Sequence, residues 1–301
     1  MDSFKNHNYE QALIETYLKL DECLNNPQVN DFLYEMNYQN GEETEENAVI
    51  NNNSYEGMYN SNLKDNPKLT KIKFKDKSIY VDLLNNNIED EGNKFKVAKE
   101  MGTTANIIMI INNTLYLANC GDSVSVMFKN GQAIKLSQEH KTTLKSEYDR
   151  IVKSGGHILN NRIEGKLNLT RAIGDLAFKN NKHLKFYDQS VTSYPEINKI
   201  KNLEGIEFII MGCDGLWDCV KPQKLCENIS KKLKQGDSIS NFKLSDIIGD
   251  IFDQILSKTN NSKNYFFLLF LAPIGTDNMS CIIIEFLQNK PTKLKISEIG
   301  N

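Results

Sequence analysis

The stretch "IEFIIMGCDGLWDCV" (206–220) decides how the rest of the sequence is interpreted. Its apolar run at 206–211 predicts a buried strand, and Asp214 follows with a glycine behind it. An aspartate at the end of a buried strand is partly desolvated, so it must be paired, protonated or bound to a metal. Trp217, the chain's only tryptophan, lies between Asp214 and Asp218, and we expect it to pack against that turn and lock it.

The same arrangement of an apolar run followed by an aspartate beside small residues occurs three more times. The aspartates are Asp122 in "LANCGDSVSV", Asp175 in "LTRAIGDLAF" and Asp277 in "PIGTDNMSCIII". Hard cations such as Mg²⁺ and Mn²⁺ bind carboxylate oxygens and water, and small neighbours leave room for that water. Each aspartate taken alone is better explained as a turn or capping residue, and only the four together favour a metal site. The spacing therefore leaves both an acid-lined metal site and separate turn aspartates open.

Composition narrows the class of protein. The chain has 301 residues, 40% of them apolar and 25% charged, which is ordinary for a globular protein of one large or two small domains. A net charge of −3 gives no basic surplus, so we expect no nucleic-acid role. No apolar run reaches the roughly 18 residues of a membrane span. The six cysteines include no C-x-x-C pair, which favours buried thiols in a reducing compartment over disulfides or zinc.

Hydrophobic periodicity predicts an α+β sandwich. Short β-rich runs at 103–111, 114–120, 124–128 and 133–137 are separated by tight turns at Asn112-Asn113 and Asn130-Gly131, and further strands are expected at 206–211 and 279–287. Because strands do not alternate with helices, the sheets should be antiparallel.

Four helices are expected around these strands. They cover residues 9–24, 146–154, 222–234 and 244–257. In the first, Leu13, Tyr17, Leu20 and Leu24 recur at helical spacing. The second should have Ser146 as its N-cap and Gly155 just past its end. The last carries an apolar face made of Leu244, Ile247, Ile248, Ile251, Phe252 and Ile255.

A long segment rich in Asn, Asp and Glu interrupts the pattern. Residues 25–93 have too little apolar surface to offset their ordering entropy, so we interpret them as a mostly disordered inserted loop. Only 71–84 alternates in a way that predicts a hairpin. A second, smaller insertion is expected at 260–270. The loop is most simply solvated, although recruitment of a partner is an alternative.

The sequence resembles the metal-dependent protein phosphatases of type 2C. Matching segments occur in the family's order: "GTTA" (102–105), "YLANCGDSVSVMFKNGQAIKLSQEHK" (116–141), "EYDRIVKSGGHI" (147–158), "LNLTRAIGDLAFK" (167–179), "PEI" (195–197), "DGLWDCV" (214–220) and "GTDNMS" (275–280). The resemblance implies a four-layer αββα fold forming a single phosphatase-like domain over 1–301.

The resemblance also implies a site and an activity. Asp214 and Asp277 would bind one of two or more Mg²⁺ or Mn²⁺ ions, Asp122 with Asp214 and Asp218 would bind a weaker one, and Gly215 belongs to the same site. A metal-activated water would hydrolyse phosphoserine or phosphothreonine in proteins, with no catalytic residue separate from the metal site. Arg171 is expected to anchor its loop, with a phosphate contact as the alternative. A monomer in the cytoplasm or nucleus is implied.

The family's N-terminal motifs do not occur in this sequence. No D-G-H and no R-x-x-M-E-D is found, and "YEQALIETYLKLDE" (9–22) resembles the helix that follows them, so the N-terminal strands of the fold are expected to be missing. Val124, Glu139 and Thr170 replace the family's Arg, Asp and Ser. Two interpretations remain open: an incomplete chain of an active phosphatase, and a pseudophosphatase acting as a binding or regulatory module. A plain scaffold explains none of the acids.

We predict that deletion of residues 30–90 leaves a cooperatively folding core. Loop length affects the closure free energy by only about 0.6 kcal/mol per doubling, so removing the segment should cost little. Thermal unfolding followed by circular dichroism checks this for the full and shortened chains. Loss of a cooperative transition in the shortened chain would show that the segment is part of the core.

Overall fold

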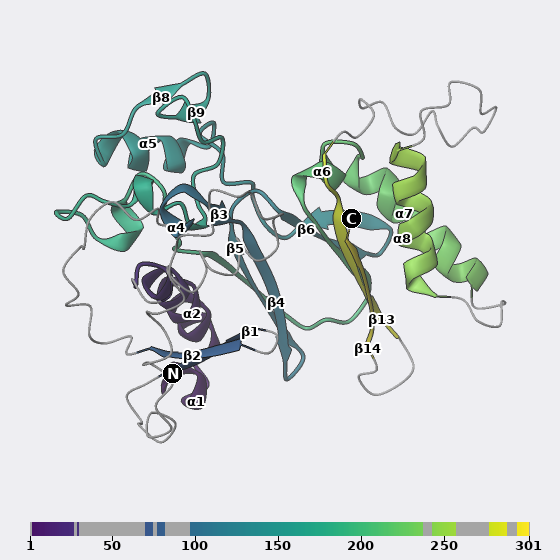
Figure 1. Cartoon of the computed structure of the whole chain (residues 1–301). Helices are drawn as coiled ribbons and strands as arrows, with labels where there is room; N and C mark the ends of the chain where they lie inside the picture. The colour runs from purple at the N-terminus through teal and green to yellow at the C-terminus, as the bar shows by residue number, and fades with distance from the viewer. Residues whose placement is uncertain are drawn as a thin grey trace, which may run out of the picture.

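The computed structural model describes residues 2–26, 29, 70–74, 77–81, 97–236, 243–256, 277–287 and 294–300. These residues form a mixed α+β arrangement (Figure 1). Every pair of named strands among them is antiparallel, which confirms the expectation from the hairpin-rich sequence. None of the helices in these ranges is long and apolar enough to cross a membrane.

The first large sheet has three strands in the order β11-β5-β4. They are β4 (Ala105–Ile111), β5 (Thr114–Cys120) and β11 (Glu196–Lys201). The β4–β5 hairpin turns at Asn112 and Asn113, whose φ angles are 49° and 57°. Asparagine tolerates this left-handed conformation, so the sequence places the turn correctly.

The second large sheet has five strands in the order β14-β13-β12-β6-β7. They are β6 (Val124–Lys129), β7 (Gln132–Lys135), β12 (Ile206–Gly212), β13 (Ser280–Phe286) and β14 (Leu294–Gly300). The predicted turn at Asn130-Gly131 joins β6 to β7, with both residues at positive φ. β12 lies in the interior of the sheet, between β6 and β13, so the strand that carries Asp214 at its end is paired on both edges.

The two large sheets share a hydrophobic core. Side chains alternate along each strand, so one set from β5 and one set from β12 point into this core. Its buried members are Leu115, Leu117, Met127, Leu136, Leu203, Ile206, Ile209 and Ile284. This alternation explains why both strands are mostly apolar, since each also carries a second buried face.

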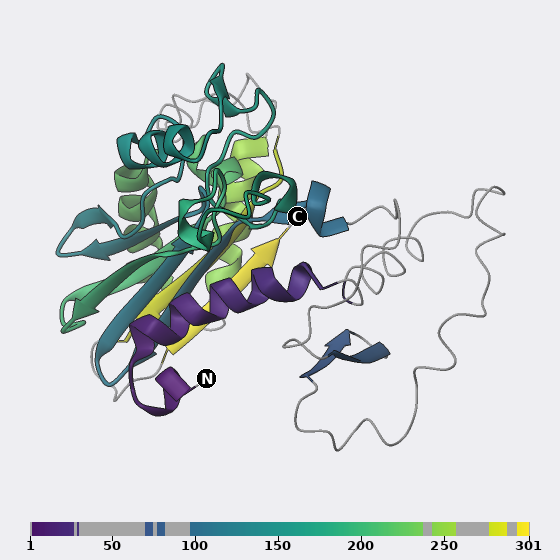
Figure 2. The ribbon, with the colours of Figure 1, turned by 90° about the vertical axis from the view of Figure 1, so that its left-hand side faces the viewer.

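Helix α2 (Tyr9–Leu24) covers the other face of the three-stranded sheet (Figure 2). Tyr17 is fully buried, and its hydroxyl donates to the Ala118 carbonyl at 2.9 Å. The helix bounds match the prediction, but Leu20 does not join the buried face and is 45% exposed. Asp21 is buried instead, because Lys179 donates to both of its carboxylate oxygens at 2.8 and 2.9 Å.

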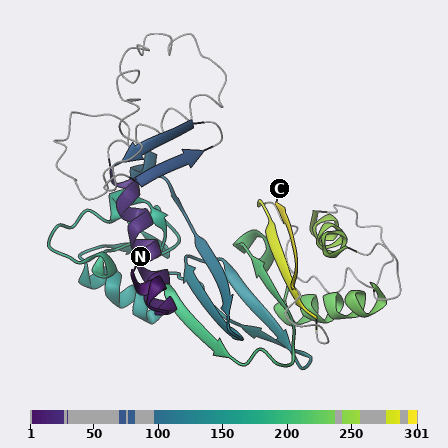
Figure 3. The same ribbon diagram turned by 90° about the horizontal axis from the view of Figure 1, so that it is seen from below.

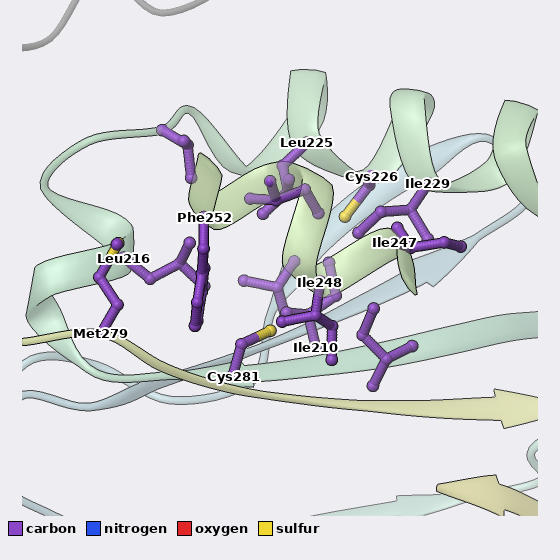
Figure 4. Close-up of a cluster of buried hydrophobic side chains, with 14 of the residues drawn as sticks. Ile210, Leu216, Leu225, Cys226, Ile229, Ile247, Ile248, Phe252, Met279 and Cys281 are labelled. Atoms are coloured by element: carbon purple, nitrogen blue, oxygen red, sulfur yellow. The ribbon is translucent and has the colours of Figure 1, made fainter. Parts of the chain in front are cut away.

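Helices α6 (Asp214–Trp217), α7 (Pro222–Gly236) and α8 (Leu244–Leu256) cover the other face of the five-stranded sheet (Figure 3). Figure 4 shows their side chains packed over β12 and β13. All six apolar residues predicted on α8 are buried there. The contacts therefore run from α2 through the two sheets to α7 and α8.

A smaller unit lies at one end of the strands (Figure 1). It contains α5 (Lys145–Lys153), β8 (Ile158–Leu159), β9 (Arg162–Ile163), η4 (Leu176–Phe178) and η5 (Phe186–Asp188). Its core is made of Ile151, Ile163, Ala172 and Val191. This unit carries the "LNLTRAIGDLAFK" segment.

The predicted N-cap of α5 is wrong. Ser146 is the second residue of the helix, and the cap position is Leu144, which makes no side-chain capping bond. The helix begins early because a turn with a bond from the Leu144 N–H to the Lys141 carbonyl (3.0 Å) precedes it. Gly155 lies just past the end with φ of +88°, as predicted.

The remaining elements are short. They are α1 (Asp2–Lys5), α4 (Val97–Glu100), β1 (Thr70–Phe74), β2 (Lys77–Val81), β3 (Gly102–Thr103) and β10 (Ile173–Gly174). β1 and β2 pair as an antiparallel hairpin, which confirms the hairpin expected within 71–84. The rest of the expected 25–93 insertion lies almost wholly outside the described residues, and 260–270 lies outside them entirely.

Candidate metal centre

Asp214 is the first residue of α6, and only Cys213 separates it from the end of β12. The apolar residues of β12 are fixed by packing on both faces, so the point where the chain leaves the sheet is fixed as well. The Gly215 N–H donates to Asp214 Oδ1 at 3.0 Å, and Gly215 itself is buried. The carboxylate is therefore held in a partly buried position beside the strand end.

Two other predicted acids act electrostatically on Asp214. Burial raises the pKa of Asp214, and the charges of Asp122 and Asp277 raise it further, while the Gly215 N–H and Lys141 oppose the rise. Asp122 is only 4% exposed, and Asp277 is exposed. The structure thus brings Asp122 and Asp277 within electrostatic range of Asp214, although the three acids come from segments far apart in the sequence.

Lys141 is the cation nearest to these acids in the contacts of the described residues. Its Nζ forms a hydrogen-bonded ion pair with Asp122 Oδ2. Adjacent His140 fixes the loop before Asp122, since the Gly121 N–H donates to His140 Nδ1 at 3.1 Å. In the neutral ring the proton must then sit on Nε2, which faces Glu196 Oε2 at 3.6 Å.

Asp218 and Asp175 are placed differently from these three acids. Asp218 is exposed, and its N–H donates to the Asp214 carbonyl at 2.8 Å. Asp175 is buried against Gly102 where β10 pairs with β3, and its N–H donates to the Met101 carbonyl at 2.8 Å. Across the described ranges, no three His, Cys, Asp or Glu side chains approach closely enough to enclose a metal ion.

Arg171 is held in a buried ionic network. Its guanidinium binds Glu147 Oε1 at 2.7 Å and donates to the Tyr194 carbonyl at 2.9 Å. Arg150 also binds Glu147, at 2.6 Å, and donates to the Thr170 carbonyl at 2.7 Å. These contacts join α5 to the segment that carries Arg171.

Glu147 stays ionised in this network. Burial alone favours the neutral acid, but the hydrogen bond from Arg171 and the charges of Arg150 and Arg171 outweigh it and lower the pKa of Glu147 to about 2. One buried carboxylate thus pairs with two arginines.

Sequence reasoning missed three ionic contacts, which are Lys141 with Asp122, Glu147 with Arg171, and Asp21 with Lys179. All six residues lie within segments quoted above as resembling the phosphatases, so their positions were visible. Their partners were not, because Asp21 and Lys179 are 158 residues apart in the chain. A charged residue inside an otherwise packed segment is the one local signal that could have identified them.

The cysteines offer no sign of a reactive nucleophile. All six are free thiols, and four are buried. Burial raises the pKa of Cys120, Cys226 and Cys281 to about 12. Such thiols stay protonated near neutral pH, and the thiolate is the nucleophilic form.

The family of the chain follows from comparison with known proteins. A family model described as Protein phosphatase 2C matches residues 2–263. Because that match covers most of the sequence, the chain belongs to the protein phosphatase 2C family.

Two curated relatives agree with this assignment. "Probable protein phosphatase 2C 11" of Oryza sativa subsp. japonica is 39% identical over 66% of this chain and 51% of its own length. "Protein phosphatase 1G" of Homo sapiens is 33% identical over 68% of this chain and 38% of its own. A solved phosphatase from Toxoplasma gondii aligns with a TM-score of 0.49 and 21% identity, over 62% of this chain and 52% of that one. The chain spans about half the length of the first of these relatives.

We predict that Glu147→Gln destabilises the fold by about 3 kcal/mol at pH 7, because removing one partner of a buried ion pair leaves buried charge uncompensated. Glu147 has a lowered pKa, so its contribution is complete above its ordinary value of 4.5 and is lost as pH falls toward about 2. The stability difference between the unmodified chain and Glu147→Gln should therefore shrink across that window in urea unfolding.

Asp149→Asn is the matched control, since Asp149 lies on the same helix in an exposed pair with Lys145. It should change stability by less than about 0.5 kcal/mol. Equal effects of the two substitutions would contradict the buried network as a source of stability.

Proposed function

We propose that this chain provides the metal site of a Mg²⁺- or Mn²⁺-dependent protein serine/threonine phosphatase. The observation that carries the proposal is the convergence of Asp122 and Asp277 on Asp214, which raises the pKa of Asp214. Carboxylates that repel one another at the end of a sheet have the donor chemistry that hard divalent cations require. Membership of the protein phosphatase 2C family supports the same reaction class.

The proposed ligands divide between two ions. Asp214 and Asp277 would hold one, and Asp122 with Asp214 and Asp218 would hold a weaker one, with Gly215 in the same site. Oxygen donors fit these cations, and Gly215 lets the segment that carries Asp277 approach the Asp214 turn. The described residues supply only part of a ligand set for a metal ion. Further ligands from the family's R-x-x-M-E-D and D-G-H-G motifs would complete it.

Bound ions would lower the pKa of a water molecule and offset negative charge on the phosphoryl group. The chain's own residues hold and orient that site. Lys141 restrains the Asp122 carboxylate, and His140 restrains the loop before it. The Glu147 network holds Arg171 in its loop, and we propose that anchoring is the role of Arg171.

The remaining proposals concern the whole protein. We propose that the layers from α2 to α8 are part of the αββα phosphatase fold and that residues 1–301 form one domain. The substrates would be phosphoserine and phosphothreonine proteins, bound by a monomer. The six free thiols support a reducing cytoplasmic or nuclear location.

We expect Mn²⁺ to raise the melting temperature of the 301-residue chain. Binding to the folded state at ten times the Kd stabilises it by about 1.4 kcal/mol, which corresponds to roughly 3–6 °C. Asp214→Asn should remove the response, whereas Asp253→Asn, an exposed change on α8, should retain it. Differential scanning calorimetry with and without Mn²⁺ measures the melting temperatures of the unmodified chain and of both variants. No response in the unmodified chain would count against the proposed site.

Phosphate release tests the activity itself. In the family's D-G-H-G motif the aspartate would bridge the two metal ions and the histidine would be the acid for the leaving group. The 301-residue chain should turn over phosphopeptides poorly with Mn²⁺, because this motif does not occur in it. A chain extended at its N-terminus by a family segment with R-x-x-M-E-D and D-G-H-G should be at least about 10²-fold faster, the typical contribution of general acid catalysis.

The extended chain with Asp214→Asn serves as the control and should be inactive. Substantial turnover by the 301-residue chain would mean that another residue replaces the bridging aspartate. An inactive extended chain that still binds Mn²⁺ would favour the alternative of a pseudophosphatase acting as a binding module.

A further inference from the structure

The Cys213 side chain joins the Asp214 turn to the segment that carries Asp277. Its Sγ accepts from the Ser280 N–H at 3.2 Å and donates to the Asn278 carbonyl at 3.4 Å. The Cys213 N–H also donates to the Ser280 carbonyl at 3.4 Å. Cys213, the residue before Asp214, is thus hydrogen-bonded to Asn278 and Ser280, which lie in the short segment that leads from Asp277 into β13.

Gly215 makes this approach sterically possible. A Cβ atom at position 215 would collide with the Asn278 carbonyl oxygen and lie 3.5 Å from Asp277 Cβ. Gly215 does not have a positive φ, so backbone conformation is not the reason for glycine here. The space that it leaves lets the Asp277 segment pack directly against the Asp214 turn.

Trp217 makes the corresponding connection on the side of Asp122. Its Nε1–H lies 3.0 Å from both the Val124 carbonyl and the Gly212 carbonyl, and donates to both. Val124 follows Asp122 by two residues and begins β6. The indole therefore links the Asp214 turn to the start of the strand that follows Asp122.

Gly212 makes room for the indole, as Gly215 does for the Asn278 carbonyl. A Cβ atom at position 212 would lie 2.9 Å from Trp217 Nε1 and 2.7 Å from a Leu216 methyl carbon. Such contacts are too close without movement of the indole. Each side of the turn thus pairs one hydrogen-bonding side chain with one glycine that leaves space for it.

We propose that Cys213 and Trp217 are positioning residues that set the separations of Asp122, Asp214 and Asp277. We call the two side chains with their bonds the Cys213–Trp217 clasp. Asp122, Asp214 and Asp277 carry like charges, and the clasp holds their three segments together through neutral hydrogen bonds to backbone carbonyls on both sides of the Asp214 turn. This inference rests on the proposed metal site, since its consequence is a ligand geometry fixed before a cation binds.

The clasp also assigns a physical role to each position of "GCDGLW" (212–217). Gly212 and Gly215 provide space, Cys213 and Trp217 provide bonds, and Asp214 is the carboxylate being positioned. Leu216 is fully buried and secures the turn to the α7–α8 core. The role of Trp217 is thus wider than the packing expected from the sequence.

The first test needs no metal. Amide hydrogen exchange is measured in the full chain and in Cys213→Ala, Cys213→Ser and Cys219→Ala. The Ser280 amide should exchange at least about tenfold faster in Cys213→Ala, while the Ile283 amide within β13 stays protected. Cys213→Ser, which keeps a donor and an acceptor, should restore protection. Cys219→Ala shortens a buried cysteine of the same turn and should leave Ser280 unchanged.

The second test measures Mn²⁺ affinity by titration calorimetry for the same proteins and for Trp217→Phe, which keeps a ring and removes the N–H. Loss of a residue that orients ligands typically weakens metal binding by about 10–100-fold. We expect at least about a tenfold loss for Cys213→Ala and Trp217→Phe, and less than about twofold for Cys213→Ser and Cys219→Ala.

The outcomes separate the clasp from the proposed function. The clasp is overturned if the Ser280 amide exchanges at an unchanged rate in Cys213→Ala. It is also overturned if Cys213→Ala and Trp217→Phe both bind Mn²⁺ as tightly as the unmodified chain. Equal losses of Mn²⁺ affinity in Cys213→Ala and Cys219→Ala would show a general loss of stability and would also overturn the clasp. An unmodified chain that fails to bind Mn²⁺ contradicts the metal site, and the exchange result then decides whether the clasp holds the segments.

Discussion

Burial of β5 and β12 on both faces is the constraint on which the rest of the structure depends. Alternate residues of β5 face the second sheet and helix α2, and alternate residues of β12 face the first sheet and α7–α8. Burying an aliphatic side chain stabilises a fold by about 1.5–3 kcal/mol, so a shift of register by one residue would disturb both cores at once. The ends of these strands are therefore held in fixed positions.

Fixed strand ends allow charged groups to be placed where they would otherwise be unfavourable. Asp122 and Asp214 follow strands β5 and β12, and Asp277 precedes β13. Repulsion among them is tolerated because apolar packing elsewhere holds the strands and because Lys141 pairs with Asp122. Local electrostatic strain of this kind is common where a protein has a functional site.

Buried ion pairs then attach the outer segments to this core. Asp21 and Lys179 join α2 to the segment after β10, and Glu147 joins α5 to Arg171. Each pair has additional bonds to backbone groups, which satisfy the donors that burial removes from water. Asp21 and Glu147 thus have opposite charges beside them in buried pairs, whereas Asp214 has two like charges within electrostatic range.

The sequence alone determined the features that depend on near neighbours. Alternation predicted the strands, helical spacing predicted the buried face of α8, and Asn112-Asn113 and Asn130-Gly131 predicted the turns, because backbone preference and side-chain period act over a few residues. Tertiary structure decided which charges meet. It buried Asp21 instead of Leu20, paired Arg171 with Glu147 and brought Asp122 and Asp277 near Asp214. Those outcomes depend on distances between segments up to 158 residues apart, which no local pattern encodes.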